Sequence, residues 1–570
     1  MPNLLMKIQP GVAGLLLVVA LLTTPYPVAA QDQPVVIEGA TLIDGTGRAP
    51  LKDSVIVIEG GRIKAAGSKG QVAIPPRAKV VRAENKFVLP GLIDAHIHFL
   101  DFMPQIFLRF GVTTVFDTAN PTEWILAQRE ALKSGKLKGP RMFVTGLIID
   151  GPVEPGGEVD NAELAGYKVR VRSSEEARVI TRKVIRQGVD AVKVHEALTP
   201  ELLEAVVAEA HRAGLEVVGH TGDVRESTRV GMKFVEHTEA ITEATVPHGT
   251  RRSAVPEADM DVAAFDPLVD LLVKNGVFFN PTLTRTSVNL MPKKSEWTND
   301  SLQYLEDKNW KFIPDRRLNF WLRVAKEPAG SPSADLMARR KEGLAKLHEF
   351  VKRFAIAGGR LITGPDTGSS SGPTNLPGVS MHVEMEALVD AGVTPMQAIM
   401  ASTKWPAELL RKEKDLGTLE PGKLADLIIL DADPLADIRN TRRISTVILD
   451  GNVVDTTLDS NFRNPMPRAV AVDSVLEYMG PRLAEITPPI AIQGQGSVKI
   501  EVSGERFKPN SIVRFDTSDL ATKFLGDKKL EAVISPKLLS EVGTYAITVV
   551  NPGSGGGTSN VRYFVVNFRD

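Results

Sequence analysis

Strand-like and helix-like segments alternate along the middle of the chain, from residue 88 to residue 414. Between short runs of β-forming residues, apolar positions recur at helical spacing, as they do around Val206 and around Val351. This alternation favours a parallel sheet covered by helices, and eight such units predict an α/β fold of the (β/α)8, or TIM-barrel, type. The expected strands are Leu92–Ile97, Val112–Phe116, Met142–Leu147, Ala191–Val194, Glu216–Gly219, Lys233–Val235, Val277–Phe279 and Arg360–Thr363.

Two β-rich blocks border this central region, over residues 31–87 and 415–458. The first block begins with the run Val35-Val36-Ile37, and the second contains the hairpin signal Asp450-Gly451. Because both blocks are short, we expect them to combine into one small composite β-sandwich. Within the central region, residues 285–340 exceed the length of an ordinary crossover, which predicts a helical insertion over the mouth of the barrel.

Strand-like runs return after a connector at residues 459–481. Over residues 482–570 they recur at intervals typical of a β-sandwich, with a turn at Asn551-Pro552-Gly553. We therefore predict a separate immunoglobulin-like domain at this end of the chain. The segment resembles the IPT/TIG modules of that fold class.

The first 30 residues have the pattern of a signal peptide. Lys7 precedes an apolar run from Gly11 to Leu22, which is short for a membrane span. The small residues of Val28-Ala29-Ala30 then predict cleavage before Gln31. We expect a periplasmic or extracellular protein without a stable membrane span after cleavage, and an uncleaved membrane anchor is the alternative.

The composition limits the chemistry that the chain can use. It contains no cysteine, which excludes disulfides, thiolate metal ligands and a cysteine nucleophile. Lys and Arg number 68 against 69 for Asp and Glu, and this balance predicts no nucleic-acid partner. A metal site would therefore use histidine, carboxylate and lysine side chains.

The segment His96-Ile97-His98 ends the first expected strand. Side chains two residues apart on a strand point to the same face, so both imidazoles can reach one cation. Taken alone, the pair also fits two polar residues at the exit of a strand.

Further residues of ligand type stand at or near the ends of later strands. Lys193 lies inside the apolar run Val192–Val194, where a lysine is costly unless it is paired or modified. In a barrel the carboxyl ends of the strands converge at one mouth, where catalysis occurs. We therefore predict a metal site that gathers six side chains, namely His96, His98, Lys193, His220, His237 and Asp366.

Two motifs resemble those of the amidohydrolase superfamily. Leu89-Pro90-Gly91-Leu92-Ile93-Asp94-Ala95-His96-Ile97-His98 is similar to its opening metal motif, and the segment from Leu416 to Leu427 is similar to its closing signature. With Gly364-Pro365-Asp366, the resemblance covers residues 35–457. Lys193 followed by two later histidines resembles the imidazolonepropionase-like and Xaa-Pro dipeptidase-like branch.

The resemblance implies two divalent metal ions with divided ligands. The first two histidines and Asp366 would hold one ion, while His220 and His237 would hold the other. Lys193, N6-carboxylated by carbon dioxide, would bridge them. A bridging water would supply hydroxide, and Asp366 would act as general base and then acid. Zinc is the first expectation for the metal, with manganese, iron and cobalt open.

Other polar residues are predicted to lie around the metal site or in supporting positions. His248 and Arg285 follow later strands and are candidates for substrate binding, since an arginine can hold a carboxylate through two hydrogen bonds. His195 is interpreted as a loop residue and His382 as a packing residue at a helix start. Asp117 could orient a ligand histidine or cap a helix.

The sequence thus predicts a metal-dependent amidohydrolase that cleaves an amide-type C–N bond in a dipeptide, an N-acyl amino acid or a cyclic amide. One alternative is a mononuclear hydrolase of imidazolonepropionase or deaminase type with unmodified Lys193. Another is a surface-binding protein that acts through its C-terminal module. For the amidohydrolase we expect a small-molecule substrate as the partner, and the sequence is also compatible with a homo-oligomer.

Overall fold

The computed structural model describes residues 33–152, 167–250, 253–285, 290, 294–326, 332–368, 375–467, 481–552 and 557–569. The predicted signal peptide, residues 1–30, and the connector beyond residue 467 lie outside these ranges. Within the described ranges, no helix combines the length and the apolar character that crossing a membrane requires.

Parallel strands form the centre of the molecule, and each of the eight predicted strand segments overlaps one of them. The strands β9 and β10 are additional: β9 directly follows the predicted segment that ends at Leu147, and β10 has a single apolar residue between Lys168 and Arg170. The central strands are β6 (Leu92–Ile97), β7 (Val112–Asp117), β8 (Arg141–Val144), β9 (Ile148–Asp150), β10 (Lys168–Arg170), β11 (Val192–Val194), β12 (Val217–Gly219), β13 (Phe234–Glu236), β14 (Phe278–Asn280) and β15 (Arg360–Leu361).

These strands pair in three parallel sheets, β6-β7-β8, β10-β9-β11-β12 and β13-β14-β15. Hydrogen bonds link the first of these sheets to each of the other two, for example from Asp190 N to Val144 O at 2.8 Å. Ala95 N in β6 donates to Thr363 O, just beyond β15, at 3.2 Å, which joins the first strand to the last. Because every pairing is parallel, the carboxyl ends of the strands lie at one edge.

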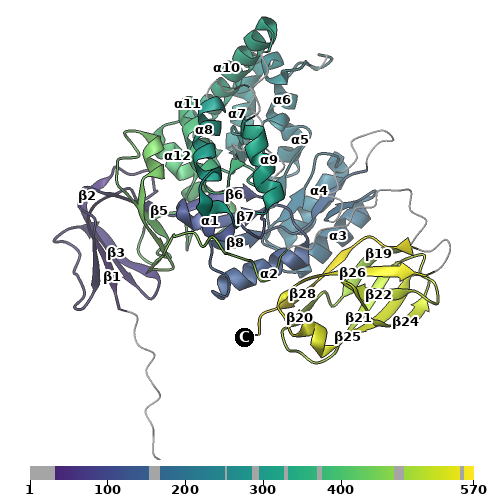
Figure 1. The fold of residues 1–570 in the computed structure, drawn as a ribbon. Helices are drawn as coiled ribbons and strands as arrows, with labels where there is room; N and C mark the ends of the chain where they lie inside the picture. The colour runs from purple at the N-terminus through teal and green to yellow at the C-terminus, as the bar shows by residue number, and fades with distance from the viewer. Residues whose placement is uncertain are drawn as a thin grey trace, which may run out of the picture.

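Helices cover the strands, which confirms the α/β class (Figure 1). Several begin at a residue that caps them, as Ser173 does by accepting a hydrogen bond from Glu176 N. The helices of the central region are α1 (Pro104–Arg109), α2 (Thr122–Lys133), α3 (Ser174–Arg186), α4 (Pro200–Arg212), α5 (Val224–Arg229), α6 (Glu239–Thr245), α7 (Phe265–Lys274), α8 (Lys294–Leu305), α9 (Asp315–Lys326), α10 (Ala334–Ile356), α11 (Val379–Asp390), α12 (Pro395–Ala401) and α13 (Lys404–Leu409).

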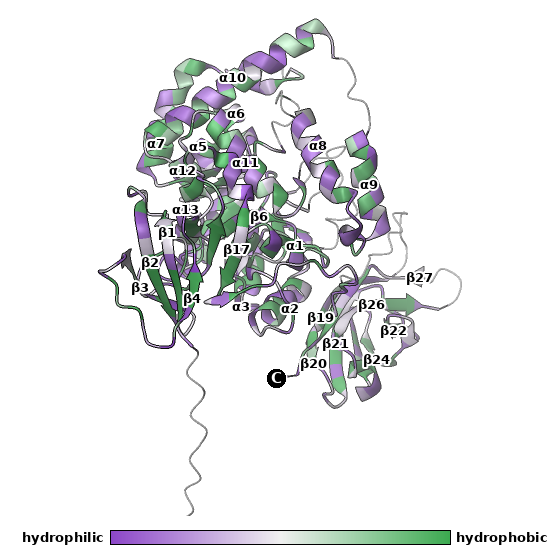
Figure 2. Ribbon diagram, turned by 60° about the vertical axis from the view of Figure 1, so that its left-hand side comes forward, coloured by the Kyte–Doolittle hydropathy of each residue, from purple (hydrophilic) through white to green (hydrophobic). Residues whose placement is uncertain are grey.

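The predicted insertion at residues 285–340 contains the helices α8 and α9, which lie side by side in both ribbon views (Figures 1 and 2). Trp297 and Trp321, one from each helix, are almost wholly buried. Trp321 meets Phe102, which lies just before α1, with ring centroids 6.1 Å apart. Aromatic burial therefore holds this insertion against the central region.

Both flanking blocks contribute to one eight-stranded sheet beside the central region. Strand β1 pairs with β4 before Gly39 and with β5 after it, and Gly39 has a φ of +89°. Neighbouring residues of β1 face opposite sides of the sheet, so separate apolar clusters form around Ile37 on one face and Val36 on the other. The strands are β1 (Val35–Leu42), β2 (Leu51–Glu59), β3 (Arg62–Ser68), β4 (Lys79–Arg82), β5 (Phe87–Pro90), β16 (Leu427–Leu430), β17 (Ile444–Leu449) and β18 (Asn452–Val453).

Residues 481–569 form a second all-β unit, called here the C-terminal module. Two sheets, ordered β19-β21-β25-β24 and β20-β28-β26-β22-β23, enclose one apolar core, and β27 pairs with β26. The strands are β19 (Arg482–Thr487), β20 (Ile490–Ile492), β21 (Val498–Glu505), β22 (Ile512–Phe515), β23 (Ser518–Asp519), β24 (Ala521–Gly526), β25 (Lys529–Ile534), β26 (Gly543–Asn551), β27 (Gly557–Thr558) and β28 (Arg562–Asn567).

The C-terminal module packs against α2 and α3 of the central region (Figure 1). Val565 is fully buried and belongs to the same apolar cluster as the central core. At the edge of this contact, Lys183 Nζ lies 2.7 Å from Glu485 Oε1. The module is therefore docked through apolar burial with a charged rim.

Candidate metal centre

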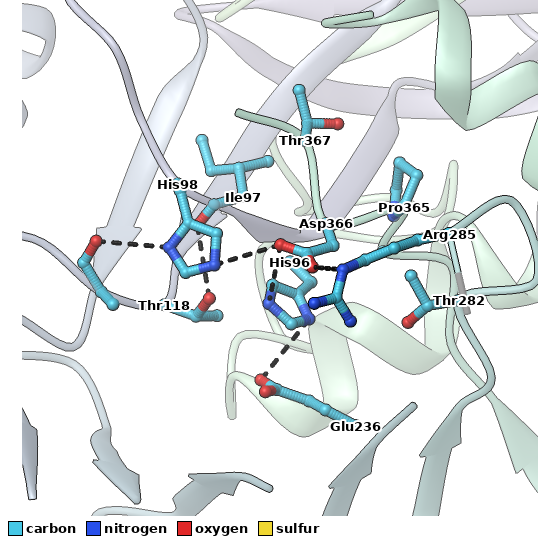
Figure 3. A network of polar contacts seen from close by, with 12 residues as sticks. His96, Ile97, His98, Thr118, Glu236, Thr282, Arg285, Pro365, Asp366 and Thr367 are labelled. Atoms are coloured by element: carbon cyan, nitrogen blue, oxygen red, sulfur yellow. Dashed lines mark hydrogen bonds and ion pairs between the residues drawn. The ribbon is translucent and has the colours of Figure 1, made fainter. Parts of the chain in front are cut away.

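His96 and His98 leave the end of β6 on the same face, as their spacing predicts. The chain after β15 runs beside them, because His98 N donates to Thr367 O at 2.7 Å and Thr367 N donates to His96 O at 3.3 Å. This pairing places Asp366 next to both imidazoles. Its Oδ1 lies 3.1 Å from His98 Nε2 and 3.6 Å from His96 Nε2 (Figure 3).

Asp366 is held in an unusual backbone conformation, with a φ of +59°. Gly364 precedes it where a Cβ atom would lie 2.6 Å from the Cβ of His96, so a larger residue would push β6 away. Arg285 Nε lies 2.6 Å from Asp366 Oδ2, opposite the histidines (Figure 3). Burial alone would raise the pKa of Asp366, but Arg285 and His98 hold it below its ordinary value.

His220 and His237 meet on the other side of His96. Their ring centroids are 4.5 Å apart, and the centroids of His237 and His96 are 5.0 Å apart. The Nδ1 atom of His237 lies 2.9 Å from Thr282 Oγ1, which leaves its Nε2 atom directed elsewhere. His237 also has a positive φ, 66°, as a result of the sharp turn that follows β13.

Lys193 is 1% exposed and forms a buried ion pair with Glu236. Glu236 Oε1 also lies 3.7 Å from His96 Nδ1, and its Oε2 lies 3.6 Å from His220 Nε2. Glu236 was not among the residues predicted from the sequence. It carries the same signal as Lys193, because it is a charged residue in an apolar strand and directly precedes a candidate ligand, His237.

Burial lowers the pKa of His96, His220 and His237 well below the ordinary histidine value, and the charge of Lys193 lowers it further. These three imidazoles are therefore neutral near pH 7, which is the form that binds metals. His98 differs, because its contact with Asp366 outweighs burial and raises its pKa.

Several polar atoms of this cluster are buried without a hydrogen bond to any described residue. They include both ring nitrogens of His96, Nε2 of His237, Oε1 of Glu236 and Oδ1 of Asp366. Such atoms are costly to bury unless a ligand satisfies them. Two sets of ligand atoms each lie within 4.8 Å of one another, His96 with His98 and Asp366, and His96 with Glu236 and His237. The residues present therefore fit a divalent metal ion.

The structure thus brings together all six side chains that the sequence analysis selected as metal ligands, and adds Glu236. Of the two predicted substrate contacts, Arg285 lies beside the cluster. His248 is exposed in the turn after α6, and no contact between described residues joins it to the cluster.

Three further residues can also be placed. His195 does follow β11 as a loop residue, yet its ring centroid lies 4.4 Å from that of His220, so it borders the cluster. Asp117 Oδ2 accepts a hydrogen bond from Phe99 N at 2.8 Å and thereby holds the turn after His98. His382 is buried in α11 between Phe110 O and Thr441 Oγ1.

A family model and a curated relative match most of the chain. The model of the amidohydrolase family matches residues 87–454. The chain is 22% identical over 465 residues to 5-methylthioadenosine/S-adenosylhomocysteine deaminase of Symbiobacterium thermophilum, covering 75% of this chain and 92% of the relative.

Two solved structures share the fold at low sequence identity. A molinate hydrolase superposes with a TM-score of 0.55 at 24% identity, covering 75% of this chain and 95% of the other. A Xaa-Pro dipeptidase with methionine in its active site superposes with a TM-score of 0.52 at 22% identity, covering 74% and 100%. The family match spans more than half of the sequence, so the chain belongs to the amidohydrolase family, whose members generally use divalent metals.

Proposed function

We propose that this protein is a metal-dependent hydrolase that cleaves an amide-type C–N bond at the cluster around His96. The observation that carries the proposal is the set of buried nitrogen and oxygen atoms that make no hydrogen bond with described residues yet face one another. A fold gains nothing by burying such atoms unless something binds them.

We also propose a closed barrel, an immunoglobulin-like C-terminal domain and a signal peptide. The parallel strands would close into a (β/α)8 barrel, which would put the cluster at its catalytic mouth. The C-terminal module would be an immunoglobulin-like domain of the IPT/TIG kind. Residues 1–30 would be a signal peptide that directs the protein to the periplasm or the extracellular space, and N-terminal sequencing of the secreted chain tests this.

In the proposed centre the ligands are divided between two ions. The pair His96 and His98 would act with Asp366, while His220 and His237 would form the second set. Lys193, carboxylated on Nζ, would join the two sets. Bound zinc, the metal we favour, would polarise the scissile carbonyl group and acidify the attacking water.

Asp366 would carry the proton in this reaction. Its Oδ1 atom faces the histidines, and Arg285 fixes its Oδ2 atom. The carboxylate would accept a proton from the attacking water and then deliver it to the leaving nitrogen, so that water and amide become carboxylic acid and amine. The lowered pKa of Asp366 keeps it ionised and able to accept that proton near neutral pH.

Arg285 would also define the substrate class. Its side chain is 34% exposed, so part of the guanidinium group remains accessible beside the cluster. A substrate carboxylate is the group that an arginine in this position binds best. We therefore propose dipeptides or N-acyl amino acids as substrates.

The ion pair between Lys193 and Glu236 supports a second candidate. A lysine already neutralised by a buried carboxylate has no need of carbon dioxide. The centre would then hold one metal ion, as expected for a hydrolase of deaminase or imidazolonepropionase type. The intact mass of the native protein separates the two candidates, because carboxylation adds the mass of one carbon dioxide to the chain.

The direct test is a screen of dipeptides, N-acyl amino acids and cyclic amides against the full-length protein reconstituted with zinc. The variant Asp366→Asn serves as the blank, and Lys341→Ala, on the exposed surface of α10, serves as the matched control. We expect hydrolysis by the wild type and the control but not by the blank. Equal activity in all three proteins would rule out the proposed centre.

Bound zinc is then counted in each active preparation. Two ions per chain, with activity lost in Lys193→Ala, favour the binuclear centre. One ion, with activity retained in that variant, favours the mononuclear candidate.

A further inference from the structure

Glu384 is a fully buried carboxylate on α11 that does not touch the candidate metal centre directly. Its exposed fraction is 0%. Its Oε1 atom accepts a hydrogen bond from Leu283 N at 2.8 Å. Its Oε2 atom accepts two more, from Thr284 N and Thr284 Oγ1, both at 2.9 Å. These three hydrogen bonds of the Glu384 side chain all go to one short loop, residues 281–285, which follows β14.

That loop carries two contacts to the centre. On one side of the anchored residues, Thr282 Oγ1 lies 2.9 Å from His237 Nδ1. On the other side, Arg285 Nε lies 2.6 Å from Asp366 Oδ2. The backbone groups that Glu384 binds are therefore flanked in sequence by the residues that orient one candidate ligand and the candidate general base.

The loop also has a conformation that requires support. Thr282 is a β-branched residue with a φ of +47°, a region that costs such residues about 1–3 kcal/mol. Hydrogen bonds from backbone N–H groups to a carboxylate are stronger than those to a neutral acceptor. Glu384 supplies two of them at the residues directly after Thr282, where they oppose relaxation of the strained turn.

The orientation of His237 depends on this turn. A proton on Nδ1 that is donated to Thr282 Oγ1 leaves Nε2 as the atom that can bind a cation, and Nε2 is buried without a hydrogen bond to any described residue. Partners of this kind fix both the tautomer and the angle of a ligand histidine. A shift of Thr282 would release both.

We propose that Glu384 is a positioning residue, which acts through Thr282 and Arg285 to hold His237 and Asp366 in the geometry that binds the metal and the substrate. The inference rests on the proposed function for its catalytic consequence. Its consequence for metal binding stands on the contacts alone, so the two can fail separately.

The chain offers a matched control two residues further along the same helix. Glu386 is also buried, at 6% exposed, but its Oε2 atom lies 3.2 Å from Arg442 Nη2, away from the loop. The variants Glu384→Gln and Glu386→Gln therefore make the same chemical change on the same element. The first replaces one carboxylate oxygen, which accepts hydrogen bonds from the loop, with an NH2 group that can only donate.

The experiment measures zinc affinity of the full-length protein by competition with a chromophoric chelator. We expect Glu384→Gln to weaken zinc binding by about 10–100-fold, as loss of such supporting contacts does elsewhere, and Glu386→Gln to leave it near the wild-type value. Equal zinc affinity in the two variants would overturn the inference, whether or not any amide is hydrolysed.

A double-mutant cycle with Thr282→Val identifies the route. This change removes the hydroxyl group that contacts His237 but keeps the branched shape. If Glu384 acts through Thr282, combining the two variants weakens zinc binding little more than the stronger single change. Multiplied effects would exclude action through Thr282, and the proposed role of Glu384 in orienting His237 would fail.

A purely structural role predicts a different pattern. Loss of general stability would lower the unfolding temperature of Glu384→Gln without a specific loss of zinc affinity in the folded fraction. Should that variant fail to fold, Thr284→Val removes only the Oγ1 hydrogen bond to Glu384. It should still weaken zinc binding several-fold, and an unchanged affinity would count against the proposal.

Discussion

The central region and the C-terminal module bury different kinds of side chain. Near the carboxyl ends of its parallel strands the central region buries Lys193, Glu236 and Asp366 together with histidines. Among the described residues of the module, the buried polar side chains are uncharged, namely Ser511, Thr544, Asn551 and Ser559.

This difference indicates that the central region contains the functional site and that the module has a structural role. Burying a charged group costs several kcal/mol unless partners or a ligand compensate it, so a fold retains such groups where they are used. The interior of the module is apolar, and the few polar groups buried in it are hydroxyl and amide groups. We therefore expect chemistry in the central region and stability or attachment in the module.

The largest expected effect is that of Asp366→Asn. We expect kcat/KM to fall by about 10²–10⁴-fold, because the amide cannot accept a proton from water. The control is the variant Ser511→Ala, which removes a buried hydrogen bond to Asn551 in the module. That change should cost about 1 kcal/mol of stability and leave kcat/KM unaltered. An equal loss of activity in both variants would remove the distinction between the two regions.

Shortening one side chain in the core of the module should lower stability without changing catalysis. Ile500 is fully buried in β21, and Ile500→Ala should reduce the free energy of unfolding of the module by about 2–5 kcal/mol. Denaturant unfolding measures this change. The kcat/KM of the folded fraction should stay at the wild-type value, and a proportional loss of catalysis would assign the module a part in the reaction.

Low pH should reduce the folding stability of the central region, because His382 binds a proton less readily in the folded chain than in the unfolded chain. Burial lowers the pKa of His382 to about 3, whereas the unfolded value is near 6.5. Because the unfolded chain binds the proton more readily, the stabilisation is complete above pH 6.5 and declines as pH falls toward 3. The decline should approach about 1.4 kcal/mol per pH unit.

The variant His382→Gln tests this assignment, since an amide can donate to Phe110 O and accept from Thr441 Oγ1 without titrating. Its unfolding midpoint should depend less steeply on pH between 6.5 and 4 than that of the wild type. Parallel curves for the two proteins would exclude His382 as the source.

The smallest effect is expected at the rim between the two regions. Lys183 and Glu485 are 37% and 45% exposed, so their ion pair should contribute at most about 1 kcal/mol and less at high salt. Lys183→Ala should thus barely change the urea midpoint, whereas Val565→Ala, in the shared apolar cluster, should lower it clearly. The reverse order would mean that charge, not apolar burial, docks the module.

Much of the fold followed from local patterns in the sequence. The strand segments were predicted because a buried strand needs a short run of apolar β-forming residues, and each overlaps a strand of the structure. The spacing of His96 and His98 predicted a shared face because strand side chains alternate. Strand β10 was missed because Lys168 and Arg170 leave it one apolar residue, and β9 was missed because it directly follows the predicted segment that ends at Leu147.

The sequence by itself determined the six candidate ligands, since the residue type and the end of a strand are both visible locally. Only the tertiary structure decided how they are supported. Glu384 reaches Leu283 across 101 positions, and Arg285 reaches Asp366, which also lies far away in the sequence. No local pattern encodes such a contact, because it depends on how α11 packs beside β14. Hydrophobic periodicity specifies which face of an element is buried, whereas the partner that meets that face is set by the packing of the whole chain.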